Sequence, residues 1–234
     1  EELQALKGLF EEFRVAQKRV EDIARTPQEQ PATLILATQV MPLAAVMVKD
    51  ISKMIDLELQ GKGGEGGDRV QVLGMMADTR GTLGLGLASI RAYLLTGEDK
   101  FARKFENLWN KNTKRFGDLS RQTANLSAEQ LAAFKEFAAK RREFSQLPPK
   151  MFKIRGSKKW NMANYLLVSE AAPRAGKILD MLMGAKNDKG VRQGGMQRNQ
   201  MKLQKNDATA IAEAIDTLDT TEWALLVIGL AIAG

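Results

Sequence analysis

Residues 73–94, LGMMADTRGTLGLGLASIRAYL, form the segment around which the predicted fold is organised. Apolar residues recur here at alternating spacings of three and four, which is typical of a helix with one face packed in a helical bundle. Arg80 takes one position on that face, and Arg91 flanks it. Because a buried guanidinium needs an anionic partner, two interpretations stay open: an ion pair within the chain, or a bound anion. The three glycines between the two arginines indicate close helix packing or space for a ligand.

The composition narrows the class of protein. The 234 residues are 44% hydrophobic and 27% charged, which is typical of a globular helical chain. Cysteine and histidine are both absent, so we expect no thiol nucleophile, histidine base, metal site or cofactor, and no enzyme activity. The formal net charge of +7 suits anionic ligands, a membrane surface or nucleic acid. No nucleic-acid motif is present and the aromatic residues lie at helical spacing, so no nucleic-acid partner is expected.

Periodicity predicts helices on both sides of the central one, which should run over 68–96 and end at Gly97. The expected helices cover about 3–23, 27–59, 101–119, 128–147, 160–182 and 196–234. Thr26 with Glu29, and Ser127 with Gln130, have the spacing of capping boxes. Prolines at 148 and 149 should end one helix, leaving a basic loop over 150–159.

An internal repeat suggests how the helices are grouped. Residues 10–13 resemble 134–137, and residues 32–44 resemble 163–175, with a proline at the same place in each copy. The predicted fold class is therefore all-α, with long helices in stacked up-down bundles. The predicted domains are 1–60 (the back half of a first module), 61–67 (a flexible linker), 68–185 (a four-helix module), 190–222 (a long signalling helix) and 223–234 (the start of a transmembrane helix).

The end of the chain, WALLVIGLAIAG over 223–234, is uninterrupted apolar sequence. It is too short to span a bilayer, which takes ~20 residues, but it suits the first half of a transmembrane helix with Trp223 at the interface. A buried C-terminal core helix is the alternative. Because the sequence starts inside a helical pattern, without an initiator Met or a signal peptide, we expect it to be a fragment cut at both ends.

Several stretches together resemble the periplasmic sensor region of bacterial methyl-accepting chemotaxis proteins of the double-bundle, helical bimodular kind. These stretches are RGTLGLGLASIRAYLLTGEDKF (80–101), FENLWNKNTKRF (105–116), KIRGSKKWNMANYLL (153–167), EAAPRAGKILDML (170–182) and TEWALLVIGLAIAG (221–234). The resemblance covers nearly the whole chain. It implies a homodimer anchored in the inner membrane, a periplasmic ligand site among the helices, and a transmembrane helix beginning near Trp223. The sensor region of a histidine kinase and a structural helical bundle without a ligand are the alternatives.

Polar residues on otherwise apolar helix faces are the candidate ligand site. They are Arg80, Asn112, Arg141 and Asn164. If they converge in one layer of a bundle, two cations and two amides would form a receptor for a small carboxylate or an amino acid. Trp109 and Trp160 could wall this site, and Arg91 and Arg155 are further candidates. The opposing interpretation is that Asp78, Asp118 or Glu170 neutralises the arginines inside the protein.

Overall fold

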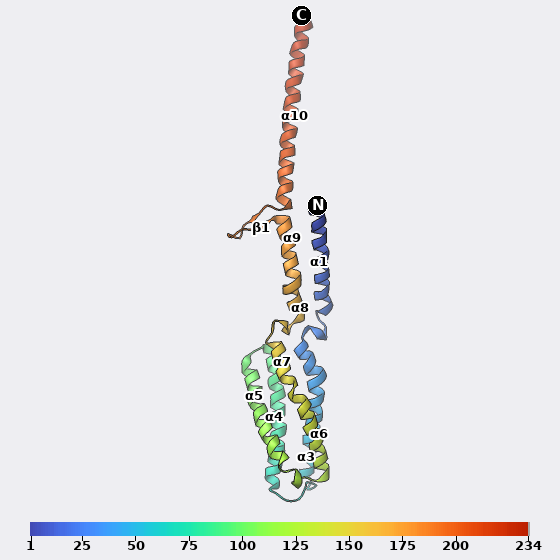
Figure 1. The fold of residues 1–234 in the computed structure, drawn as a ribbon, viewed down its shortest axis with the longest axis vertical. Coiled ribbons are helices and arrows are strands. Elements are labelled where there is room, and N and C mark those ends of the chain that lie inside the picture. Colours follow the sequence, from blue (N-terminus) through green and yellow to red (C-terminus); the bar gives the residue numbers. More distant parts are fainter. Residues whose placement is uncertain (234) are drawn as a thin grey trace. The chain divides into compact units, whose positions relative to one another are not determined.

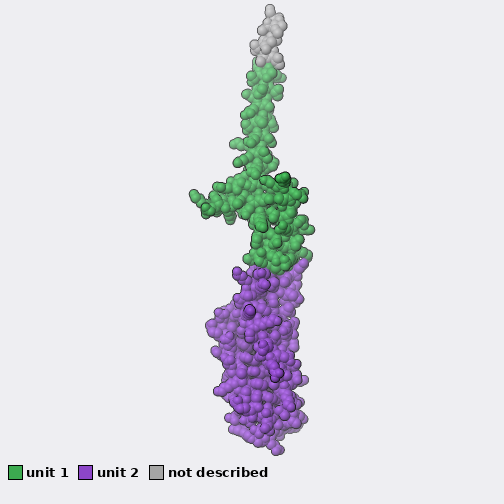
Figure 2. All heavy atoms as spheres, in the orientation of Figure 1, with its two compact units in different colours: residues 1–20, 166–234 green, residues 21–165 purple. Residues whose placement is uncertain are grey.

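The chain divides into two compact units, which Figure 2 colours separately. The computed structural model describes the backbone of residues 1–233 and the side chains of residues 1–223. Unit 1 contains residues 1–20 and 166–234, and unit 2 contains residues 21–165. Both are built from helices, which confirms the predicted all-α class (Figure 1).

Unit 2 is a bundle of long helices joined by short loops (Figure 1). Its elements are η1 (Pro27–Glu29), α2 (Pro31–Ile35), η2 (Leu36–Val40), α3 (Met41–Leu59), α4 (Arg69–Thr96), α5 (Asp99–Ser120), η3 (Thr123–Asn125), α6 (Ala128–Ser145), α7 (Leu147–Arg155) and η4 (Lys158–Trp160). Helix α4 packs along α5, α3 packs against both α6 and α4, and α2 packs on α7. The core of this unit lies between the four long helices α3, α4, α5 and α6.

Helix α4 begins and ends where its sequence predicts. The Asp68 carboxylate accepts a hydrogen bond from the backbone N–H of Gln71 at the N-terminus. Gly97 follows the last turn with a φ of 73°, a left-handed conformation that favours glycine. Gly86 faces α5, because a Cβ there would lie at an ordinary contact distance of 3.5 Å from the Phe105 ring. The capping box of Ser127 is also confirmed at the start of α6.

The prolines at 148 and 149 do not lead into a loop. They occupy the first turn of α7, where a missing N–H costs no hydrogen bond, so residues predicted as a basic loop continue as helix to Arg155. The capping box predicted at Thr26 is also absent. The Thr26 hydroxyl donates to the carbonyl of Ile23, and the Glu29 carboxylate accepts from the Arg25 backbone N–H instead.

The internal repeat is visible in the backbone. In the first copy, η1, α2, the π-helical turn η2 and α3 follow one another, and η4, α8 (Met162–Leu166), the π-helical turn η5 (Leu167–Ala171) and α9 (Ala172–Met183) repeat this order. Each π turn ends two residues before a proline, Pro42 or Pro173. A proline cannot donate to the carbonyl four residues earlier, and its ring crowds that carbonyl, so the wider turn accommodates it.

The glycine-rich segment 61–67 is a fastened loop between α3 and α4, and it does not separate two modules. Its Gly64 N–H donates to the Gln130 side chain at 3.1 Å. The fully buried Gln130 also donates to the Met54 carbonyl (3.0 Å) and to the Glu58 carboxylate (2.9 Å). Arg69 closes the loop through an ion pair with Glu58. The segment 61–67 lies within unit 2, and the boundaries between the two units fall after residues 20 and 165.

Unit 1 contains α1 (Glu2–Ile23) up to residue 20, with η5, α9 and α10 (Met196–Ala233). Between α9 and α10 lies a short hairpin of β1 (Ala185–Lys186) and β2 (Arg192–Gln193), in the segment predicted as a break. Ion pairs between Arg19 and Glu170 (2.5 Å) and between Arg174 and Glu12 (3.8 Å) join α1 to η5 and α9.

One stretch within the described side chains, Pro31–Leu59, is long and apolar enough to cross a membrane. Val40, Met47, Ile51 and Met54 in this stretch are fully buried, so the core of unit 2 accounts for its apolar character. In the predicted membrane segment 223–234, the side chains that follow Trp223 lie outside the described residues.

Candidate functional site

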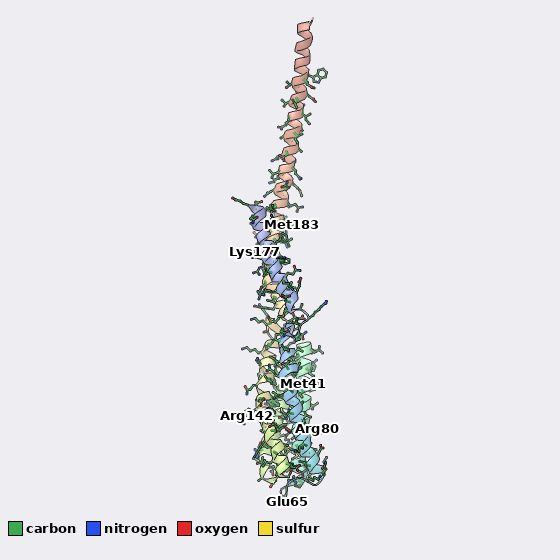
Figure 3. The ribbon with its side chains drawn as sticks, turned by 90° about the vertical axis from the view of Figure 1, so that its right-hand side faces the viewer. Met41, Glu65, Arg80, Arg142, Lys177 and Met183 are labelled. Atoms are coloured by element: carbon green, nitrogen blue, oxygen red, sulfur yellow. The ribbon has the colours of Figure 1, made fainter. Side chains whose placement is uncertain are left out.

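The inward face of α4 differs from the prediction at one position. Thr79 is fully buried there, whereas Arg80, which Figure 3 labels, is exposed. Both residues fit a helical spacing after the buried Met76, and the cost of desolvating a guanidinium decides between them. The Thr79 carbonyl and the Thr82 hydroxyl accept hydrogen bonds from Asn112 at 2.8 and 2.9 Å. The prediction that Arg80 lies in the bundle interior is therefore wrong.

Asn112, Arg141 and Trp109 do come together, and we call them, with Thr113 and Phe116, the Arg141 cluster. Arg141 of α6 donates through Nε to Asn112 Oδ1 (3.1 Å) and through Nη2 to the Thr113 hydroxyl (2.7 Å). Its guanidinium carbon lies 4.4 Å from the centre of the Trp109 ring and 4.7 Å from that of Phe116. The cation is thus held between two aromatic faces, an arrangement that favours a positive charge.

The electrostatics of the Arg141 cluster are unusual for a half-buried cation. Burial lowers the pKa of Arg141 to about 10, so the group stays protonated at neutral pH. Within the described side chains, its hydrogen bonds go to neutral acceptors and no carboxylate forms an ion pair with it. Asn112 extends the contacts to α4, so one polar layer links α4, α5 and α6. Among the described side chains, no carboxylate pairs with the positive charge of this layer.

Arg155 and Trp160 form a second, separate contact. Arg155 Nε donates to the Leu94 carbonyl at 2.8 Å, and its guanidinium carbon lies 4.5 Å from the centre of the Trp160 ring. The Leu94 carbonyl belongs to the last turn of α4, where a cation is favourable. Arg155 therefore acts as a cap on this helix.

Arg91 and Asn164 lie outside the Arg141 cluster. Both are exposed, and Arg91 contacts the sulfur of Met41 at 3.1 Å. The Asn164 backbone N–H donates to Asn161 Oδ1 in the first turn of α8. Of the two arginines and two asparagines predicted to form one layer, only Asn112 and Arg141 come together, and Arg80 and Asn164 do not join them.

The acidic residues that could have neutralised these arginines pair with others. Asp78 binds Arg115 at 2.8 Å, and Asp118 binds both Arg115 (3.4 Å) and Arg121 (2.5 Å). The third, Glu170 in unit 1, pairs with Arg19 of α1. The sequence reasoning overlooked Arg115 and Arg121, although the Arg115–Asp118–Arg121 spacing of three was a readable signal.

Asp50 of α3 is another buried charge that the sequence reasoning missed. It is only 9% exposed, and its Oδ2 has no hydrogen-bond partner among the described residues. Burial, followed by repulsion from Glu136, raises the pKa of Asp50. The described residues contain no group of three acidic side chains able to hold a metal ion.

Comparison with known proteins identifies no relative: no family model, no curated protein and no solved structure matches this chain.

Proposed function

We propose that this chain is the periplasmic ligand-sensing region of a homodimeric transmembrane receptor in a bacterial inner membrane. A small carboxylate or amino acid would bind at the Arg141 cluster and shift the population of helix arrangements. A displacement of α10, which continues into the apolar segment 223–234, would carry the signal inward. A chemoreceptor and a histidine kinase would use such a region in the same way.

One observation supports this proposal most directly. The cation of Arg141 is fixed between Trp109 and Phe116 and hydrogen-bonded to neutral acceptors, while Arg115 and Arg121 of the same bundle pair with carboxylates. A carboxylate reaching this guanidinium would complete a charge-assisted pair with a side chain already held in place, so little ordering entropy would oppose binding.

A second function is favoured by the same contacts. The Arg141 cluster can be a structural polar layer that fixes which faces of α4, α5 and α6 meet, as buried polar residues do in some helical assemblies. In that case the guanidinium needs no anion, because Asn112, Thr113 and the two rings already hold it in place.

Thermal unfolding of the full chain in detergent, with and without succinate, acetate, benzoate or glutamate, separates the two functions. A ligand at a hundredfold excess over its Kd stabilises the native state by about 2.7 kcal/mol, or roughly 5–10 °C for a chain of this size. The shift should disappear in Arg141→Met and persist in the matched variant Arg80→Met, whose arginine is exposed on the same bundle.

The structural alternative predicts a different result. Arg141→Met would then lower the melting temperature, and no acid would raise that of the wild type. A shift that Arg141→Met retains would refute the assignment of the ligand to this cluster.

A further inference from the structure

A polar groove of about 550 Å³ opens between α4 and α5, and its lining differs from the Arg141 cluster. The lining residues are Gln71, Gly74, Met75, Asp78, Arg115, Asp118, Arg121 and Gln122. Asp78 pairs with Arg115, while the more C-terminal Gly86 packs on the earlier Phe105, so the two helices run in opposite directions. The groove therefore follows both helix axes.

A glycine keeps this groove open. A Cβ added at Gly74 would meet no atom within 4 Å beyond its own helix, so a side chain there would project into free space. Met75 beside it is half-buried and provides an apolar wall. An extended ligand can lie over these two residues without displacing any side chain.

The charges along the groove alternate in sign. Asp78 pairs with Arg115, Arg115 with Asp118, and Asp118 with Arg121. Two acids and two bases make this chain of ion pairs neutral, with a carboxylate at one end and a guanidinium at the other. Asp78 Oδ2 accepts from Arg115, which leaves Oδ1 for a second donor, and the Arg121 side chain is 72% exposed.

The two ends of the chain of ion pairs, Asp78 and Arg121, are separated by the side chains of Arg115 and Asp118. Arg115 lies opposite Asp78, and Arg121 lies six residues later, directly after the end of α5. At a rise of 1.5 Å per residue the backbone of Arg121 lies about 9 Å along the axis from that of Arg115, and the ion pair with Asp118 holds the Arg121 guanidinium beside that carboxylate. The amides of Gln71 and Gln122 line the groove together with Arg121.

We propose that the α4–α5 groove binds a linear zwitterion whose ammonium and carboxylate groups are well separated, such as an ω-amino acid or a short peptide. The ammonium group would bind Asp78 and the carboxylate Arg121. A zwitterion can make a charge-assisted contact at each end of the chain of ion pairs, whereas a simple anion or cation can make only one, so the zwitterion is preferred. This site does not depend on the proposed function of the Arg141 cluster.

Calorimetric titration of the full chain with ε-aminocaproate tests the proposal. Caproate and hexylamine, which have a similar length but one charge each, should bind about tenfold more weakly or worse, because each loses one charge-assisted contact. Asp78→Asn and Arg121→Gln should weaken ε-aminocaproate by a similar factor. Comparable binding of caproate, or no detectable binding of ε-aminocaproate to the folded wild type, would overturn the proposal.

A filled groove provides a variant that should remain folded. Gly74→Leu places a side chain in the groove, and its Cβ would meet no atom within 4 Å, so it should abolish ε-aminocaproate binding with no fall in melting temperature. Gly84→Leu is its match on the same helix, since Gly84 is also exposed and unobstructed but does not line the groove. Equal binding by both glycine variants would also reject the site.

Retained binding of ε-aminocaproate in Arg141→Met would show that the two sites are separate, whereas loss of binding in that variant would contradict the assignment to a separate groove.

Discussion

Replacing Gln130 with leucine should destabilise unit 2 severely, although it keeps the helix and nearly the same volume. The Gln130 side chain is fully buried and accepts from the N–H groups of Gly64 and Ser127 at 3.1 and 3.2 Å. It donates to Met54 and to the Glu58 carboxylate. A neutral hydrogen bond contributes about 0.5–1.5 kcal/mol and one to a charged group about 1.5–3 kcal/mol. We expect Gln130→Leu to cost about 3–5 kcal/mol, or roughly 10 °C of melting temperature.

The measurement is thermal and urea unfolding of the full chain followed by circular dichroism. Gln4→Leu, at an exposed position of α1, should be nearly neutral. Gln130→Glu keeps both acceptor contacts but sets a second carboxylate beside Glu58. Burial alone would raise the pKa of Glu58, yet hydrogen bonds from Arg69 and Gln130 hold it below its ordinary value. Gln130→Glu should therefore be most harmful at neutral pH, and a change within 0.5 kcal/mol for Gln130→Leu would refute the reasoning.

Two further predictions concern stability. Alanine at the exposed, unobstructed Gly81 or Gly84 should stabilise the chain by about 0.5–1 kcal/mol each. Gly64→Ala should instead destabilise the chain, because its Cβ would clash with a backbone carbonyl of the α5–α6 loop. Equal melting temperatures for all three variants would contradict this prediction. Burial, with repulsion from Glu136, raises the pKa of Asp50, so its contribution to stability is greatest at low pH and is lost as the pH rises through that raised pKa. Asp50→Asn should therefore raise the melting temperature more at pH 8 than at pH 4, and a pH-independent difference would argue against it.

The helices were predictable from the sequence, but the way in which they are grouped was not. Periodicity and caps located α4 and the start of α6 because these signals are local. The repeat, however, shows only that two segments share a local conformation and does not determine which helices they pack against. The first copy packs in unit 2 because the loop over 61–67 reverses the chain and Gln130 fastens it there, a contact 66 residues apart that no local pattern reveals.

The candidate site was predictable in part for a similar reason. Asn112 and Arg141 stand out because each interrupts an apolar face, and the structure brings them into contact. Arg80 seemed to do the same, but a helix rotated by one residue presents Thr79 instead and leaves the long cation in solvent. The ion pairs of the α4–α5 groove escaped prediction because charged residues on polar faces are the usual composition of a solvated helix surface.

The two π turns have a consequence for how this chain tolerates changes in length. In each turn a backbone N–H, of residue 41 or 172, bonds a carbonyl five residues earlier in place of four, so each turn holds one residue more than an α-helix needs. Deleting one residue within 36–40 or 167–171 would remove this surplus and leave the following helix with its original face inward. The deletion of a single residue, which elsewhere in a helix rotates all that follows by about 100°, would therefore leave the packing beyond these two places the same.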